Sequence, residues 1–188
     1  AVAGVIGKKS AVVTNLPWII EAERVAAAFG FARVVLLNDL TAVCASVPLL
    51  GPEDWIELQP GDGEGGEMIA VIAPGTGLGE GLLVQSNSVF FPCGGEGGHS
   101  DFAPVNEEQQ DLLQWMLRRG GPVSCEDLIA GPGIATLYDF LKETGREEES
   151  GAGAEALAGA VDRTPVIGTA ALADRPCPLC RRTMELFL

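Results

Sequence analysis

The sequence predicts an α/β protein, and three observations support this class. Hydrophobic residues make up 47% of the 188 residues, which is enough to form a sizeable core. Strand-like runs rich in Val, Ile and Leu alternate with helix-like segments in the first fifty or so residues. Two further apolar runs enclose the glycines of residues 75–81, which predicts a strand, a glycine turn and a return strand.

The amino-terminal part is expected to contain three strands and two helices. The expected strands cover residues 1–6, 10–15 and 32–39, the last of them buried. The expected helices cover residues 17–31 and 40–50. Pro17 suits the start of the first helix and Gly30 its end.

A domain boundary is predicted close to residue 49, because prolines and glycines cluster at residues 48–52. Beyond the glycine turn, residues 94–104 are expected to form a polar loop. An amphipathic helix is expected at residues 106–121, acidic at its start and basic at its end. The remaining expectations are two helices around a Gly-Pro-Gly break in residues 124–143, an exposed insertion at 144–164 and a broken helix at 169–188.

The charge balance excludes some partners and leaves others open. A net charge of -14 argues against DNA, RNA or an anionic membrane surface as a partner. It leaves room for a small anionic ligand, because backbone N–H groups can hold a phosphate without a basic surface. The sequence has no apolar run of about 20 residues and no signal-peptide pattern. Its five cysteines form no disulfide framework, so we expect a reducing, cytoplasmic location.

The stretch IAPGTGLGEGLLV, residues 72–84, fits neither of the two commonest nucleotide-binding loops. Starting from Gly75, the sixth position of a dinucleotide fingerprint is Glu80 instead of glycine. A Walker loop would need a lysine, and none is near. The stretch is therefore either a tight hairpin or a phosphate loop between two strands. Thr76, between Gly75 and Gly77, favours the second, because its hydroxyl lies beside accessible backbone N–H groups.

Asn38 and Asp39 end a predicted strand and precede a predicted helix. Ligand-binding and catalytic groups collect at such strand ends in open α/β sheets. Asp39 could act as a general base for a hydroxyl, with Asn38 donating to a neighbouring one. The alternative is that Asp39 is only the N-cap of the helix.

Three other polar residues are candidates for binding a polyol. Glu96 and His99, the single histidine, lie in the glycine-rich segment GGEGGHSDF. Carboxylates accept hydrogen bonds from several hydroxyls, and imidazole can bind an adjacent one. Glu126 is predicted to open a helix, where it would otherwise serve only to complement the helix dipole. CPLC, residues 177–180, has the spacing of half a zinc site, but without a second pair of ligands we predict no metal site in the chain.

Together and in this order, several segments resemble the bacterial glucokinase family. They are LLNDLTA, APGTGLGEG, GGEGGHSDFAP, SCEDLIAGPGIATLY and CPLCRRTMELF. The resemblance covers most of the chain and is weakest over residues 144–167. It implies the ribonuclease H-like, actin-like ATPase and hexokinase fold, with two α/β domains around a cleft. Residues 1–49 would then be part of the small domain, and residues 50–188 an incomplete large domain.

The resemblance also implies an activity and residue roles. The family transfers the γ-phosphoryl group of ATP, with Mg²⁺, to the 6-hydroxyl of glucose at the entry to glycolysis, and homodimers are typical. By match of motifs, Asp39 is the catalytic base. Asn38, Asp39, Glu96, His99 and Glu126 are sugar ligands, and Gly75, Thr76 and Gly77 form the second phosphate loop.

The sequence departs from the family pattern in ways that keep alternatives open. The family's first phosphate loop and its adenosine-binding carboxyl-terminal segment are absent from these residues, so we expect the chain to be the middle of a longer enzyme. One alternative is a sugar kinase of the repressor/kinase group, although CPLC lacks that group's third cysteine. The other is a non-catalytic sugar-binding module, which would not need Asp39 as a base.

Overall fold

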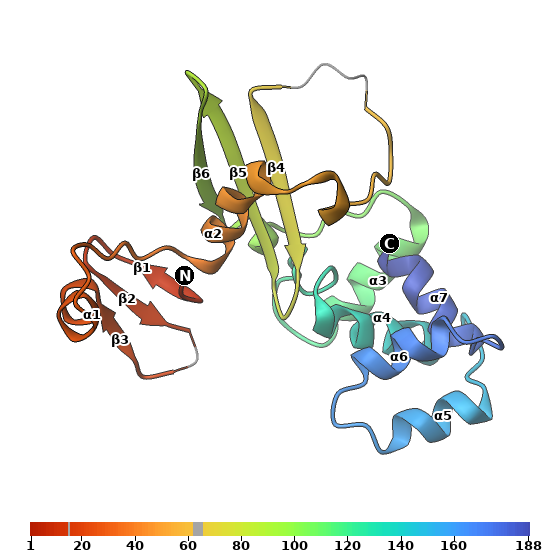
Figure 1. The fold of residues 1–188 in the computed structure, drawn as a ribbon. Coiled ribbons are helices and arrows are strands. Elements are labelled where there is room, and N and C mark those ends of the chain that lie inside the picture. Colours follow the sequence, from red (N-terminus) through yellow and green to blue (C-terminus); the bar gives the residue numbers. More distant parts are fainter. Residues whose placement is uncertain (15, 62–65) are drawn as a thin grey trace. The chain divides into compact units, whose positions relative to one another are not determined.

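The computed structural model describes residues 1–14, 16–61 and 66–188. The chain divides into two compact units. Unit 1 comprises Ala1–Ala73 and Glu80–Glu96, and unit 2 comprises Pro74–Gly79 and Gly97–Leu188. The boundary predicted near residue 49 falls within unit 1 of this chain, and the assignment of residues 1–49 and 50–188 to two domains stays a prediction. Figure 1 shows the order of the elements.

Unit 1 begins with the two predicted strands, β1 (Gly4–Ile6) and β2 (Ser10–Val13), joined by residues 7–9. They form an antiparallel sheet with β3 (Ile19–Glu21), in the order β1-β2-β3 (Figure 1). Helix α1 (Ala22–Phe29) follows β3 and ends at Gly30, as predicted. Gly30 has a left-handed φ of 69°, which glycine adopts without steric cost. Asn15, placed by the sequence at the end of the second strand, lies outside the described residues.

Two expectations for this part of the chain are wrong. The helix expected from residue 17 begins only at Ala22, because the isoleucines of β3 pair with β2 instead. The buried strand expected at residues 32–39 is absent from the described structure, where Val2 and Asn38 form a single parallel bridge. A strand needs successive pairs, and Val35 is 60% exposed instead of buried.

The second sheet of unit 1 has the order β4-β5-β6 (Figure 1), formed by β4 (Met68–Pro74), β5 (Leu78–Ser86) and β6 (Val89–Gly95). The predicted strand, glycine turn and return strand are therefore confirmed. The tip of this first hairpin, Pro74–Gly79, belongs to unit 2. A second hairpin, which the sequence prediction did not separate, turns at Asn87 and Ser88, both with positive φ. Helix α2 (Asp39–Ser46) packs on β6, and the short 3₁₀ helices Val47–Leu49 and Pro52–Asp54 follow it.

Unit 2 is mainly helical. Its elements are the 3₁₀ turn η3 (Gly97–His99) and helices α3 (Glu107–Leu117), α4 (Gly131–Glu143), α5 (Gly151–Ala158), α6 (Thr164–Ala171) and α7 (Pro178–Phe187). Helix α4 is central, because it packs against both α6 and α7 and supplies much of the buried core. The amphipathic helix expected at residues 106–121 is confirmed in α3, with Asn106 as its N-cap.

Two further expectations are wrong in unit 2. Glu126 does not open a helix, because Asp127 accepts hydrogen bonds from the N–H and the hydroxyl of Ser124 and closes a turn there. The helix begins only at Gly131, with Pro132 in its first turn. Residues 144–164 are not simply an exposed insertion, since they contain α5, whose Leu157 is buried in the helical core.

Replacing Gly133 by alanine is expected to destabilise unit 2. A Cβ at this position would lie 2.2 Å from the carbonyl oxygen of Leu128, so the backbone would have to move. Overpacking of this kind costs about 1–3 kcal/mol, and thermal unfolding should show a lower Tm than that of the unaltered protein. Gly168→Ala in α6 is the matched control, because nothing lies within 4 Å of its added Cβ. A Tm for Gly133→Ala equal to that of Gly168→Ala would contradict the prediction.

Across the part of the chain that the structure describes, every helix is too short or too polar to cross a membrane.

Candidate functional site

Asn38, in unit 1, is the N-cap of α2. Its Oδ1 accepts hydrogen bonds from the backbone N–H groups of Leu40, at 3.0 Å, and Thr41, at 3.3 Å. Its Nδ2 donates to the carbonyl oxygen of Gly4, at 3.3 Å. The capping role that the sequence offered as the alternative for Asp39 therefore belongs to Asn38. An amide carries two N–H donors, so one remains for a ligand after the bond to Gly4.

Asp39 is the first residue of α2, and it is exposed. One of its carboxylate oxygens accepts from the backbone N–H of Leu40, at 3.0 Å. The cap at Asn38 and this bond determine where the carboxylate lies. The second oxygen, and the remaining lone pair of the first, can accept a proton or a hydrogen bond from a ligand.

Two glycines set the position of α2 on its sheet. A Cβ on Gly81 would lie 2.6 Å from Sγ of the buried Cys44, and a Cβ on Gly94 would lie 3.1 Å from Oγ1 of Thr41. Larger residues at either position would push the helix, and Asp39 with it, away from β5 and β6. Gly81 belongs to the glycine-rich stretch of residues 72–84, yet its role is helix packing. Glu96 follows the end of β6 and closes unit 1.

Glu126, in unit 2, contacts both the glycine turn and His99. Its Oε2 accepts from the backbone N–H of Leu78, at 2.8 Å, and its Oε1 lies 3.7 Å from Nδ1 of His99. A Cβ on Gly77 would lie 2.5 Å from the same Oε2, so only glycine lets the carboxylate approach this closely. The structure therefore places two predicted sugar ligands beside the predicted phosphate loop.

The segment around His99 is also held by a close backbone contact. Gly98 is buried, and a Cβ there would lie 2.4 Å from the carbonyl oxygen of Leu78. The carbonyl of Gly98 accepts from the N–H of Glu126, at 2.8 Å. In the structure, Gly98 allows close approach of the β5 backbone.

The glycine turn is held at its first residue as well. The N–H of Gly75 donates to the carbonyl of Gly77, at 2.8 Å, which closes the turn around Thr76. The carbonyl of Gly75 accepts from the N–H of Gly131, the first residue of α4, at 2.7 Å. Thr76 is exposed at the tip, where its hydroxyl and the neighbouring backbone can bind an anion.

The predicted site residues thus form two groups, one in each unit. Asn38, Asp39 and Glu96 belong to unit 1, and the glycine turn, His99 and Glu126 belong to unit 2. Sequence reasoning missed the Leu78 N–H and Gly131 as supports of the turn. The Gly-Pro-Gly of residues 131–133 could have indicated a helix start, since proline is favoured in the first turn.

Cys177 and Cys180 are both buried at the start of α7. Burial raises the pKa of the Cys180 thiol to about 12. In the described ranges 1–14, 16–61 and 66–188, no three His, Cys, Asp or Glu side chains gather in a way that could hold a metal ion.

Comparison with known proteins gives a consistent result. The family model described as Glucokinase matches residues 1–188. A glucokinase from Nostoc punctiforme is 36% identical over 210 residues, which cover 100% of this chain and 58% of the relative. A glucokinase from Colwellia psychrerythraea is 33% identical over 187 residues, covering 100% of this chain and 55% of the relative.

Solved structures resemble the chain in fold. The crystal structure of a glucokinase from an Antarctic psychrotroph aligns with a TM-score of 0.79 at 28% identity, over 100% of this chain and 55% of that one. A glucokinase from Balamuthia mandrillaris, solved in complex with glucose, aligns with a TM-score of 0.68 at 23% identity, over 100% of this chain and 56% of that one. The chain therefore spans somewhat more than half the length of the relatives it matches.

Proposed function

The chain belongs to the glucokinase family, and from this premise we propose that the whole protein transfers the γ-phosphoryl group of ATP to the 6-hydroxyl of glucose. Phosphoryl transfer depends mainly on positioning the reactants and stabilising charge. The proposal therefore assigns each predicted site residue a positioning or proton-accepting task.

Asp39 is proposed as the general base. In this assignment its carboxylate accepts the proton of the 6-hydroxyl as the oxygen attacks the γ-phosphorus. The position of Asp39 at the capped start of α2, with an accessible carboxylate, supports the assignment. The second amide N–H of Asn38 would donate to a neighbouring sugar hydroxyl.

Glu96, His99 and Glu126 are proposed as the other sugar ligands. Glucose is uncharged and rich in hydroxyls, so carboxylates and an imidazole suit it as acceptors and donors. Glu126 uses one lone pair on Leu78 and retains others for hydroxyls. A site built from such groups discriminates strongly against sugars that lack an expected hydroxyl, because its polar groups would then be left without partners.

Gly75, Thr76 and Gly77 are proposed to bind phosphate oxygens of ATP through backbone N–H groups and the Thr76 hydroxyl. Mg²⁺ would neutralise charge on these phosphates. The described residues offer no three-ligand metal site, so we expect Mg²⁺ to enter with ATP and assign it no residue of this chain.

The wider architecture of the whole protein is part of the same proposal. It would have the ribonuclease H-like, actin-like ATPase fold, with a cleft between a small domain that includes residues 1–49 and a large domain that includes residues 50–188. Closure of the domains would exclude water, which competes with glucose as acceptor. We also propose a cytoplasmic location, where ATP is available, and a homodimer.

The observation that carries the proposal is the position of Glu126 between the glycine turn and His99, because it puts sugar-type ligands beside a phosphate-type loop. The test is a coupled assay of the whole protein with ATP, Mg²⁺ and a panel of sugars. We expect glucose to be the preferred acceptor. Preference for an N-acetylated sugar would favour the repressor/kinase group instead, and sugar binding without turnover would favour a non-catalytic module.

A further inference from the structure

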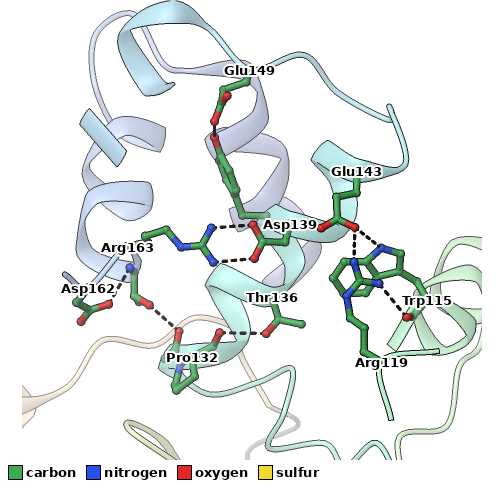
Figure 2. A network of polar contacts seen from close by, with 12 residues as sticks. Trp115, Arg119, Pro132, Thr136, Asp139, Glu143, Glu149, Asp162 and Arg163 are labelled. Carbon is green, nitrogen blue, oxygen red and sulfur yellow. Dashed lines mark hydrogen bonds and ion pairs between the residues drawn. The ribbon is translucent and has the colours of Figure 1, made fainter. Parts of the chain in front are cut away.

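A polar network connects the start of α6 to α4 (Figure 2). Thr164 and Arg163 are consecutive residues at the start of α6, and both contact α4. Neither residue belongs to the proposed sugar or phosphate ligands.

Thr164 contacts the first residue of α4. Its Oγ1 donates to the carbonyl oxygen of Gly131, at 2.9 Å, and this bond is partly buried. Its own backbone N–H donates to Asp162, at 3.0 Å, which holds the start of α6 (Figure 2). The N–H of Gly131 in turn donates to the carbonyl of Gly75, at 2.7 Å. Two successive hydrogen bonds therefore lead from the Thr164 side chain to the proposed phosphate loop.

Arg163 contacts the same helix two turns further on. Its guanidinium donates two hydrogen bonds to the carboxylate of Asp139, both at 2.7 Å (Figure 2). A two-pronged pair of this kind restricts orientation as well as distance. Because neighbouring residues hold α4 at positions 131 and 139, the helix can neither slide nor rotate freely against α6.

The contact between Gly131 and Gly75 leaves little room for movement of the start of α4. A Cβ on Gly131 would lie 3.0 Å from the Gly75 carbonyl oxygen. A small shift of the α4 start would therefore break the bond to Gly75 or press on the turn. On its other side the turn is held at Leu78, through Glu126.

We propose that Thr164, supported by the Arg163–Asp139 pair, is a positioning residue that sets the phosphate-binding conformation of residues 75–77 through Gly131. This inference rests on the proposed function, because it takes the turn to be the phosphate loop. Thr164 touches neither ATP nor glucose in this scheme. It connects to the turn at Gly75, a proposed nucleotide contact, so we expect its main effect on nucleotide binding.

The test compares Thr164→Val with Thr164→Ser and Thr169→Val in the whole protein. Valine keeps the shape and removes the hydroxyl, and serine retains it. Thr169 is the matched control on α6, because its hydroxyl donates to the carbonyl oxygen of Pro165 within the same helix, at 2.8 Å. Titration calorimetry with a non-hydrolysable ATP analogue measures the Kd, and steady-state kinetics measure the KM for glucose and kcat.

We expect Thr164→Val to weaken binding of the analogue by about 3–10-fold, the effect of one lost hydrogen bond. The KM for glucose should change by less than about twofold, and Thr164→Ser and Thr169→Val should bind the analogue like the unaltered protein. A Kd for Thr164→Val within the error of Thr169→Val would overturn the inference. Equal weakening of the Kd for the analogue and the KM for glucose, together with a lowered Tm, would also overturn the inference, because it would indicate only a structural role.

The two proposals fail in different measurements. If the unaltered protein binds the analogue but phosphorylates no sugar, the proposed function fails while the Thr164 comparison still stands as a test of the turn. If the unaltered protein phosphorylates glucose and Thr164→Val binds the analogue normally, only the positioning role fails. No binding of the analogue by the unaltered protein would overturn both.

Discussion

Asp39→Ala in the whole protein is expected to lower kcat for glucose phosphorylation by at least about 100-fold, the usual contribution of a general base. Sugar affinity should be largely retained, because Asn38, Glu96, His99 and Glu126 would still provide hydrogen bonds to the hydroxyls. Steady-state kinetics give kcat, and the Kd for glucose from calorimetry separates loss of chemistry from loss of binding.

Asp39→Asn is the control that separates proton transfer from local structure. Asparagine retains an oxygen that can accept from the N–H of Leu40, the bond that Asp39 makes at the start of α2. We expect its Tm to match that of the unaltered protein and its kcat to fall nearly as far as that of Asp39→Ala. A near-normal kcat for Asp39→Asn would show that Asp39 is not the base.

Substitution of Glu126 is expected to have the second largest effect, and the kind of substitution should decide which substrate is affected. Glu126→Gln removes the charge but keeps an oxygen for the N–H of Leu78. The KM for glucose should rise by about 10–100-fold, since hydrogen bonds to a charged group are among the stronger ones. The KM for ATP should change little, because the support of the turn remains.

Glu126→Ala removes both functions of the side chain. The Leu78 N–H loses its acceptor, while the bond from Gly131 to Gly75 remains. We expect the KM for ATP to rise as well as the KM for glucose. The neighbouring Asp127→Asn is the matched control, because that carboxylate accepts from the N–H and the hydroxyl of Ser124 within the same turn. Equal KM values for Glu126→Gln and Asp127→Asn would refute the role of Glu126 in sugar binding.

Local signals predicted several elements correctly. The Gly30 stop of α1, the hairpin of β4 and β5 and the Asn106 start of α3 each depend on residues a few positions apart. The glycine turn also failed the two common nucleotide fingerprints for a local reason, since Glu80 stands where a glycine is needed and no lysine is near. Such features are readable because backbone conformation and capping are short-range effects.

Elements that depend on distant partners were predicted wrongly. The isoleucines at residues 19–20 are compatible with a helix or a strand, and their pairing with β2 stabilises the strand. The apolar run at residues 34–37 has a strand composition, but composition cannot supply the neighbours a ladder needs. Leu157 lies in a segment of small and polar residues, and its burial follows from packing in the helical core of unit 2.

The amino-acid sequence alone indicates which chemical groups are present and in what local frame, including Asp39 beside a helix start and Thr76 between two glycines. The order of its motifs also indicates the family to which the chain belongs. Long-range packing is needed to make Asn38 the cap, to place Glu126 against Leu78 and to place Gly131 against Gly75. Glu126 and Leu78 are 48 residues apart. Contacts of that range arise from the packing of whole elements, which no local periodicity or spacing encodes.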